Sequence, residues 1–264
     1  MPHRLIATGL SDVGRMRQVN EDSLWFDNHQ QAWIVADGMG GHAAGQVASN
    51  IAAQEFARFI CETRHTPQFS WAFEPDRGRS VEENFLMNAL RIANVRIYNQ
   101  AVRTPKHFGM GTTAVAAMRS SSDELVVAAV GDSRCYRYRR GSLTQLTTDH
   151  SLLNHLIYQL KLSPEEAMEK TGTNVIIKAL GLDIDVEVDL VRSTLMDGDL
   201  FILCSDGLSD LVPHDQLIGL IQRYIRGDLN QLVRALIDQA NAAGGTDNIS
   251  VICMQARSEN TQTR

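Results

Sequence analysis

Four aspartates lie at the ends of four short apolar segments, where their carboxylates could bind metal. Carboxylates at the ends of buried strands meet when the strands pack together, and they repel one another unless a cation neutralises them or their pKa values shift. Oxygen ligands without nearby cysteine or paired histidine favour Mg²⁺ or Mn²⁺ over zinc or copper. The four are Asp37, Asp132, Asp206 and Asp247, which adjoin the apolar runs 33–36, 125–130, 201–204 and 249–253.

Each of these aspartates also has a simpler explanation. Asp-Gly and Asp-Asn pairs are common turn formers, so any single one is explained equally well as a turn residue. Four of them at apolar strand ends favour the metal site. Gly38, beside Asp37, adds to this prediction because a glycine lets a backbone carbonyl approach a metal closely.

The polar segment 11–22 supplies further groups suited to phosphate chemistry. Arg17 can bind a phosphate through two parallel hydrogen bonds. Glu21 and Asp22 can contact a metal directly or support the residues that do so. The alternative interpretation is a solvated loop whose side chains cap backbone groups.

The composition is that of a globular protein and excludes several other classes. The 264 residues are 44% hydrophobic and 21% charged, with a net charge of -6, which argues against nucleic-acid binding because that requires a basic face. Four cysteines without a CxxC pair fit a reducing compartment. The N-terminus lacks the apolar run of a signal peptide, and no stretch reaches the roughly 18 apolar residues of a membrane span. We therefore expect a cytoplasmic protein.

Apolar runs predict strands, and apolar residues at helical spacing predict helices. The order of elements does not alternate as βαβα, so we expect an α+β fold with antiparallel sheets packed together and helices outside. We expect one domain over residues 1–257, a surface excursion at 61–80, a mobile flap with short helices at 151–173 and a disordered tail at 258–264. The predicted strands are 33–36, 113–118, 125–130, 135–139, 186–191, 201–204 and 249–253, and the predicted helices are 44–60, 82–102, 215–225 and 229–243.

Seven blocks of sequence resemble the bacterial form of the metal-dependent PPM/PP2C protein phosphatases. They occur in the family's order over residues 5–255, which makes the resemblance very specific. The blocks are S-D-x-G-x-x-R-x-x-N-E-D from Ser11, V-A-D-G-M-G-G-H from Val35, G-T-T from Gly111, G-D-S-R from Gly131, L-T-x-D-H-S from Leu146, C-S-D-G-L from Cys204 and G-T-D-N-I-S from Gly245.

The resemblance implies a four-layer α/β/β/α sandwich, in which two antiparallel sheets are flanked by helices and a binuclear metal centre lies at one edge. It assigns Asp37 as the bridge between the two metals and the carbonyl of Gly38 as a ligand to one of them. It places Asp206 and Asp247 on the other metal. Bacterial relatives hold a third, weaker metal near the positions of Asp132 and Asp206.

The activity implied by the resemblance is hydrolysis of phosphoserine and phosphothreonine in proteins, with Asp37 and Asp206 as catalytic carboxylates and Arg17 on the phosphate. Two Mn²⁺ or Mg²⁺ ions about 4 Å apart would lower the pKa of a bridging water and deliver hydroxide to phosphorus. No covalent phosphoenzyme is required. The expected partners are phosphorylated targets of a serine/threonine kinase, and we expect a monomer that binds neither nucleic acid nor membrane.

Histidine roles stay open. Eukaryotic relatives carry a histidine directly after Asp-Gly, where this chain has Met39. His42, three residues later, either contacts the substrate or caps the following helix. His150 belongs to a family block and is expected to order local structure. A metal-bound water is an alternative acid for the leaving group, so none is assigned.

The same residues bear on other possible functions. A cysteine-dependent phosphatase needs an arginine six residues after its thiolate, and no cysteine here has one. A pseudophosphatase usually lacks metal aspartates, whereas all four are present. A regulatory phosphatase dedicated to one kinase pathway, in a secretion system or a sigma-factor switch, is compatible with the sequence. An interaction module acting through the excursion or the flap could coexist with catalysis.

Overall fold

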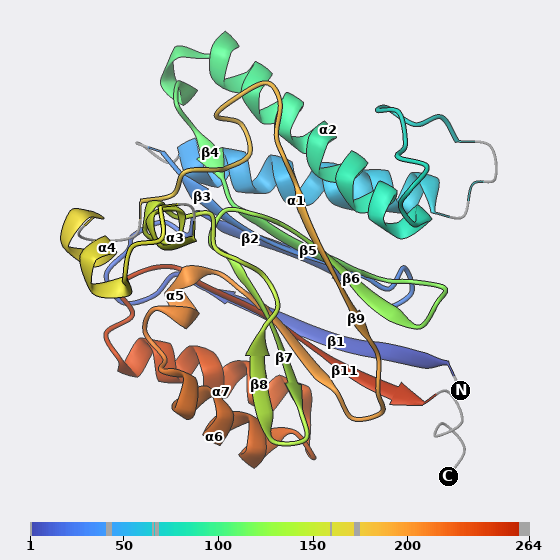
Figure 1. Ribbon diagram of the computed structural model, residues 1–264, viewed down its shortest axis with the longest axis vertical. Helices are drawn as coiled ribbons and strands as arrows, with labels where there is room; N and C mark the ends of the chain where they lie inside the picture. The colour runs from blue at the N-terminus through green and yellow to red at the C-terminus, as the bar shows by residue number, and fades with distance from the viewer. Residues whose placement is uncertain are drawn as a thin grey trace.

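Two antiparallel β-sheets lie face to face in the computed structural model, and helices cover both outer faces (Figure 1). The structure describes residues 2–40, 44–64, 66, 69–158, 160–171 and 175–258. These four layers form the α+β sandwich that was expected. The first sheet has the strand order β1 (His3–Asp12), β11 (Ile249–Ser258), β10 (Leu200–Cys204), β7 (Arg134–Arg139) and β8 (Ser142–Gln145).

The second sheet lies between the first sheet and the two longest helices. Its strand order is β2 (Asp22–Asp27), β3 (Ala32–Met39), β5 (Ala114–Arg119), β6 (Glu124–Val130) and β9 (Asp189–Thr194), and β4 (Gly111–Thr112) pairs with β3. Helices α1 (Ala44–Thr63) and α2 (Val81–Arg103) cover this sheet, while α5 (Asp206–Ser209), α6 (His214–Tyr224) and α7 (Leu229–Ala242) lie on the first sheet. The remaining elements are η1 (Pro105–His107), α3 (Leu152–Tyr158) and α4 (Pro164–Thr171).

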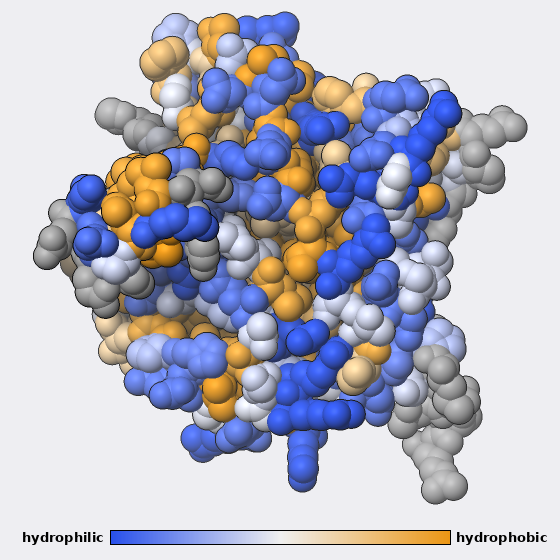
Figure 2. All heavy atoms as spheres, viewed as in Figure 1, coloured by the Kyte–Doolittle hydropathy of each residue, from blue (hydrophilic) through white to orange (hydrophobic). Residues whose placement is uncertain are grey.

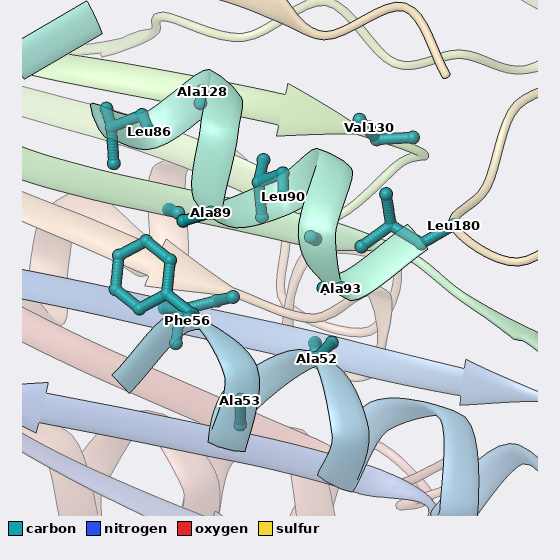
Figure 3. Close-up of a cluster of buried hydrophobic side chains, with 14 of the residues drawn as sticks. Ala52, Ala53, Phe56, Leu86, Ala89, Leu90, Ala93, Ala128, Val130 and Leu180 are labelled. Carbon is teal, nitrogen blue, oxygen red and sulfur yellow. The ribbon is translucent and has the colours of Figure 1, made fainter. Parts of the chain in front are cut away.

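The central strands are buried on both faces, which explains why they read as continuous apolar runs. In β3, Trp33 and Val35 face the layer between the sheets, whereas Ile34 and Ala36 face the helices. This alternation follows from the two-residue period of a strand. The helix-side layer is rich in alanine, which lets α1 and α2 approach the sheet and each other. Figure 3 shows this packing with Ala52, Ala53 and Phe56 of α1 beside Leu86, Ala89, Leu90 and Ala93 of α2.

The edge strands β1 and β2 were not predicted, because they bury few side chains and therefore lack an apolar run. Only Leu5 and Ala7 of β1 are buried. The strand predicted at 186–191 is wrong in its bounds, since β9 spans Asp189–Thr194. Val186 and Val188 pack against the helical layer instead, so their alternation reflects a packed loop. The other predicted strands and helices occur, with ends that differ by a few residues.

The segment expected to form a surface excursion packs partly inward. Helix α1 continues to Thr63, and Phe69 and Trp71 then join Phe59 and Phe85 in an aromatic cluster. The rings of Phe69 and Phe85 are stacked with their centroids 5.3 Å apart. Helices α3 and α4 occupy the predicted flap. Residues 259–264 of the predicted tail lie outside the described residues.

Candidate metal centre

Strand ends bring the predicted aspartates to one edge of the sandwich, beside the short helix α5 (Figure 1). Asp37 lies in β3, directly opposite Asp22 in β2. Asp206 begins α5 immediately after β10, Asp132 follows the end of β6, and Asp247 precedes the start of β11. Carboxylates from both sheets therefore gather at a single edge.

Burial and mutual repulsion disfavour the ionised forms of these carboxylates. Burial raises the pKa of Asp37 well above its ordinary value, and the charges of Asp22 and Asp206 raise it further. Burial likewise raises the pKa of Asp22 and of Asp206 to about 6 and that of Asp132 to about 7, with neighbouring carboxylates adding to each. A bound cation would reverse this effect, because its charge favours the ionised carboxylates.

Unpaired carboxylate oxygens provide a test of whether a cation fits. Oδ1 of Asp22, Oδ1 of Asp132, Oδ1 of Asp206 and Oε1 of Glu21 are buried without a hydrogen bond. Leaving a buried polar atom unpaired is costly unless something else binds it. Among the described residues no three His, Cys, Asp or Glu side chains form a ready-made metal cage. The unpaired carboxylate oxygens suit Mg²⁺ or a similar hard cation, which prefers oxygen ligands.

Glycines allow the backbone to pack closely around the carboxylates. A Cβ atom on Gly38 would lie 2.1 Å from the carbonyl oxygen of Gly45, so the start of α1 could not approach β3 if another residue stood there. A Cβ atom on Gly207 would lie 2.0 Å from the carbonyl oxygen of Asn248. The lack of a side chain at Gly207 therefore lets α5 lie close to the loop that carries Asp247. Close packing therefore accounts for Gly38, and its carbonyl as a metal ligand stays a prediction.

Arg17 lies in the loop between β1 and β2, and hydrogen bonds connect this loop to the segment before β11. The backbone N–H groups of Arg15 and Met16 both donate to the carbonyl of Gly245, at 2.7 and 3.1 Å. Nη2 of Arg17 donates to Oδ2 of Asp247 at 2.8 Å. This hydrogen bond and the charge of Asp247 raise the pKa of Arg17. The predicted phosphate-binding group thus lies against a predicted metal ligand.

Several hydrogen-bonding residues of the site were not predicted. The Ser205 hydroxyl donates to Oδ2 of Asp22 at 2.8 Å and accepts from the N–H of Ser250 at 2.9 Å. Oδ1 of Asn248 accepts from the N–H of Glu21 at 2.7 Å. Ser205 and Asn248 are sequence neighbours of predicted ligands, and that adjacency was the available signal.

The Asn248 amide also ties the Arg17 loop to the site. Its Nδ2 donates to the carbonyls of Val13 and Val19, at 2.9 and 3.0 Å. The two ends of the loop are therefore held by one side chain. His42 lies outside the described residues, so its expected contact with the substrate stays a prediction.

A second polar group surrounds Asp132. Arg134 donates three hydrogen bonds to Asp149, from Nε and Nη2 to Oδ2 at 2.9 and 2.7 Å and from Nε to Oδ1 at 3.1 Å. Nη2 also lies 3.8 Å from Oδ1 of Asp210. Asp149 and Asp210 raise the pKa of Asp132, after burial and Asp206. Arg134 therefore offsets part of the negative charge on this side of the site.

The family model for protein phosphatase 2C matches residues 14–247 of this chain. A serine/threonine phosphatase named stp from Listeria welshimeri is 36% identical over 249 residues, which cover 93% of each chain. The crystal structure of the Mycobacterium tuberculosis serine/threonine phosphatase PstP/Ppp superimposes with a TM-score of 0.80 at 31% identity, covering 96% of this chain and 99% of that one.

A further solved structure contains metal. It is the catalytic domain of a serine/threonine protein phosphatase PstP in complex with two manganese ions. Its TM-score is 0.79 at 32% identity, and the match covers 97% of this chain and 100% of that chain.

Proposed function

The chain belongs to the protein phosphatase 2C family, and from this premise we propose how its residues hydrolyse phosphoserine and phosphothreonine. It is a metal-dependent protein serine/threonine phosphatase that acts on phosphorylated proteins. The observation that carries the proposed mechanism is the gathering of buried carboxylates with unpaired oxygens beside the half-exposed Arg17. Cations and a phosphate group would each find complementary charge there.

The proposed metal ligands follow from the positions of the carboxylates. Asp37 lies opposite Asp22 and is affected by the charge of Asp206, so it would serve both ions, with the carbonyl of Gly38 as a ligand to one and Asp206 and Asp247 as ligands to the other. The all-oxygen donor set supports Mn²⁺ or Mg²⁺. When bound, these ions supply Lewis-acid stabilisation of the phosphoryl oxygens and lower the pKa of water.

The environment of Asp132 supports a separate, weaker cation site. Its Oδ1 is unpaired, and the charge of Asp206 contributes to its raised pKa. One buried oxygen of Asp22 and one of Glu21 have no hydrogen bond, and the other Asp22 oxygen accepts from the Ser205 hydroxyl. We therefore assign Asp22, and with it Glu21, a supporting role that leaves one buried oxygen of each side chain for the metal centre or its water.

Arg17 is the proposed phosphate-binding residue. Its guanidinium is 51% exposed and can be reached by a ligand while it remains beside Asp247. A guanidinium donates two parallel hydrogen bonds to phosphate as it does to carboxylate, so it can orient the phosphoryl group for in-line attack. Because hydrogen bonds already hold the loop between β1 and β2, less conformational entropy is lost when Arg17 binds the phosphate.

The three buried cysteines are poorly suited to covalent catalysis. Burial raises the pKa of the Cys204 thiol to about 12 and raises those of Cys135 and Cys253 as well. Thiolate is the nucleophilic form, so these side chains would be inert. This supports direct attack by water without a phosphoenzyme. All four cysteines are free, which supports a reducing compartment such as the cytoplasm.

The substrates we propose are targets of a serine/threonine kinase, bound by a monomeric enzyme. Hydrophobic side chains gather around α3 and α4 on the face shown in Figure 2. Leu160, Val175 and Ile177 are among the exposed apolar residues of this region. Such a surface supports contact with a folded protein substrate.

Among the described helices, none combines the length and apolar character needed to cross a bilayer.

The test is Mn²⁺-dependent hydrolysis of p-nitrophenyl phosphate and of a phosphothreonine peptide. We expect the intact chain to hydrolyse both, and Asp37→Ala to lose activity by a factor of roughly 10² or more. Asp238→Ala, on the exposed face of α7, is the matched control and should retain full activity. An inactive intact chain across Mn²⁺ and Mg²⁺ concentrations would refute the proposal.

A further inference from the structure

His150 clamps the turn that carries Asp132. The N–H of Gly131 donates to Nδ1 of the His150 ring at 3.0 Å, and the N–H of His150 donates to the carbonyl of Gly131 at 2.9 Å. The His150 residue is only 8% exposed, and its own carbonyl accepts from the N–H of Ile177 at 2.9 Å. One residue from the chain after β8 therefore holds both backbone groups of Gly131.

The clamped turn has little freedom to rearrange. Gly131 has a φ of +101°, a conformation that other residues adopt only with strain. A Cβ atom there would lie 2.7 Å from the side chain of Thr113. Asp132 follows directly and is buried with an unpaired Oδ1. The direction of this carboxylate thus depends on the backbone that His150 holds.

The hydrogen bond from Gly131 also fixes the tautomer of His150. Because Nδ1 accepts an N–H, the ring proton must lie on Nε2. Nε2 is buried and has no hydrogen bond in this structure, and Oδ2 of Asp189 lies 3.1 Å away as an ion-pair contact. A small rotation of the Asp189 side chain would complete an Nε2–H···O hydrogen bond.

Asp189 connects the His150 ring to the second sheet, in which β6 ends just before Gly131. It is the first residue of β9 and pairs with Ala129 of β6, two residues before Gly131. Its side chain is 49% exposed and lines a pocket of about 540 Å³. Lys178 also lines the pocket, with Nζ 3.9 Å from Oδ1 of Asp189 and 2.7 Å from Oε2 of Glu187. Asp189 is therefore the solvent-accessible end of a chain of contacts leading to Asp132.

We propose that His150 is a positioning residue for Asp132 and that Asp189 orients the His150 ring for this task. The carboxylate holds the Nε2–H tautomer, the ring holds the Gly131 turn, and the turn aims Asp132 at a cation. Partners of this kind behind a metal ligand are worth 10–100-fold in metal affinity. The inference rests on the proposed function, since it takes Asp132 as the ligand of the weaker cation site.

The test measures Mn²⁺ binding by isothermal titration calorimetry, which needs no catalysis. We expect Asp189→Ala to weaken the weakest Mn²⁺ site by roughly 10-fold, to leave the tighter sites unchanged and to leave the melting temperature of the metal-free chain unchanged. Asp189→Asn keeps an acceptor and should restore most of the affinity. Glu187→Ala is the matched control, because it removes a carboxylate from Lys178 in the same pocket without touching His150. Its Mn²⁺ affinities should equal those of the wild type.

A second measurement addresses the ring itself. Long-range ¹H–¹⁵N NMR spectra of His150 should show the proton on Nε2. A proton on Nδ1, a wild-type chain without a third Mn²⁺ site, or equal affinities in Asp189→Ala and wild type would each overturn the inference. Failure of the proposed function is distinguishable, because it appears as absent hydrolysis of the phosphothreonine peptide by the wild type whatever the Mn²⁺ titrations give.

Discussion

Nη2 of Arg17 and Oδ2 of Asp247 lie 2.8 Å apart, joining the loop after β1 to the loop before β11. The pair is exposed, with 51% of the arginine side chain and 35% of the aspartate side chain accessible. Exposed ion pairs contribute about 0–1 kcal/mol to stability, so the structure gains little from this one. Its consequence is positional, since it holds a guanidinium beside the carboxylates.

Removal of Arg17 should therefore impair catalysis far more than folding. We expect Arg17→Ala to lower kcat/KM for a phosphothreonine peptide on the order of 10²-fold, because a fixed donor to the phosphoryl group is lost. Arg17→Lys should recover only part of this, since a lysine cannot donate two parallel hydrogen bonds. The free energy of unfolding should change by less than about 1 kcal/mol. Arg15→Ala removes the same charge from the same loop, and the prediction is wrong if it reduces kcat/KM as much.

The crowded carboxylates should destabilise the chain when metal is removed. Burial and the charges of Asp210 and Asp247 raise the pKa of Asp206 to about 6, so ionising this side chain costs more free energy in the folded chain than in the unfolded chain. Asp206→Asn should therefore stabilise the chain in EDTA by about 1–3 kcal/mol. In saturating Mn²⁺ the order should reverse, because only the wild type gains binding free energy at this ligand.

Thermal unfolding monitored by circular dichroism checks both conditions. Asp238→Asn, an exposed position on α7, should match the wild type in EDTA and in Mn²⁺. Equal melting temperatures for Asp206→Asn and wild type in EDTA would contradict the repulsion that the buried cluster implies.

Two glycine substitutions should have opposite effects. Gly38→Ala places a methyl group 2.1 Å from the carbonyl oxygen of Gly45, so we expect a loss of about 1–3 kcal/mol or more as α1 is pushed from β3. Gly219→Ala meets no atom within 4 Å in the exposed helix α6 and should stabilise the chain by about 0.5–1 kcal/mol. Urea unfolding measures both, and a neutral Gly38→Ala would show that the helix approach is not tight.

The start of α2 should give the chain a pH-dependent increment of stability. Burial acts to raise the pKa of Glu83, but hydrogen bonds from Arg192 and from the Ser80 N–H lower it below its ordinary value of 4.5. A carboxyl group whose pKa is lowered by folding stabilises the folded chain at pH values above its ordinary pKa. This stabilisation is lost as the pH falls through the folded-state pKa. Glu83→Gln should therefore cost about 1 kcal/mol at pH 7 and progressively less below pH 4.5.

Chemical unfolding at a series of pH values provides the measurement for Glu83. Glu82→Gln is the control, since Glu82 is in the same helical turn but lies outside the capping box. A cost that stays constant from neutral to acidic pH would show that the charge of Glu83 is not involved.

The strand-end aspartates could be predicted because their neighbours are buried on both faces. Trp33 to Ala36 form a fully buried segment, so the position of Asp37 at its end is visible in a single sequence. Asp22 has no such signal, because β2 is an edge strand whose apolar side chains are only partly buried. Its place opposite Asp37 depends on strand register, which local sequence does not encode.

The supporting hydrogen bonds could not be predicted for a related reason. Asn248 contacts Val13, Val19 and Glu21, which lie more than two hundred residues earlier in the chain. Such contacts exist only once β1 and β11 pair, and an asparagine after an aspartate is also an ordinary turn residue. The strand predicted at 186–191 shows the same limit, since Val188 is buried in the helix-side layer although the strand pairing of β9 begins only at Asp189.

The proposed metal ligands belong to different sheets, so catalysis depends on the relative position of the two sheets. Asp37 is carried by the second sheet, and Asp206 and Asp247 flank strands of the first. The spacing between them is therefore set by the layer in which Trp33 and Phe201 meet, far from any phosphate. A substitution that lets one sheet shift against the other would lower kcat while leaving each sheet folded. We therefore expect kcat to be more sensitive to substitutions in the layer between the sheets than to substitutions in the outer helical layers.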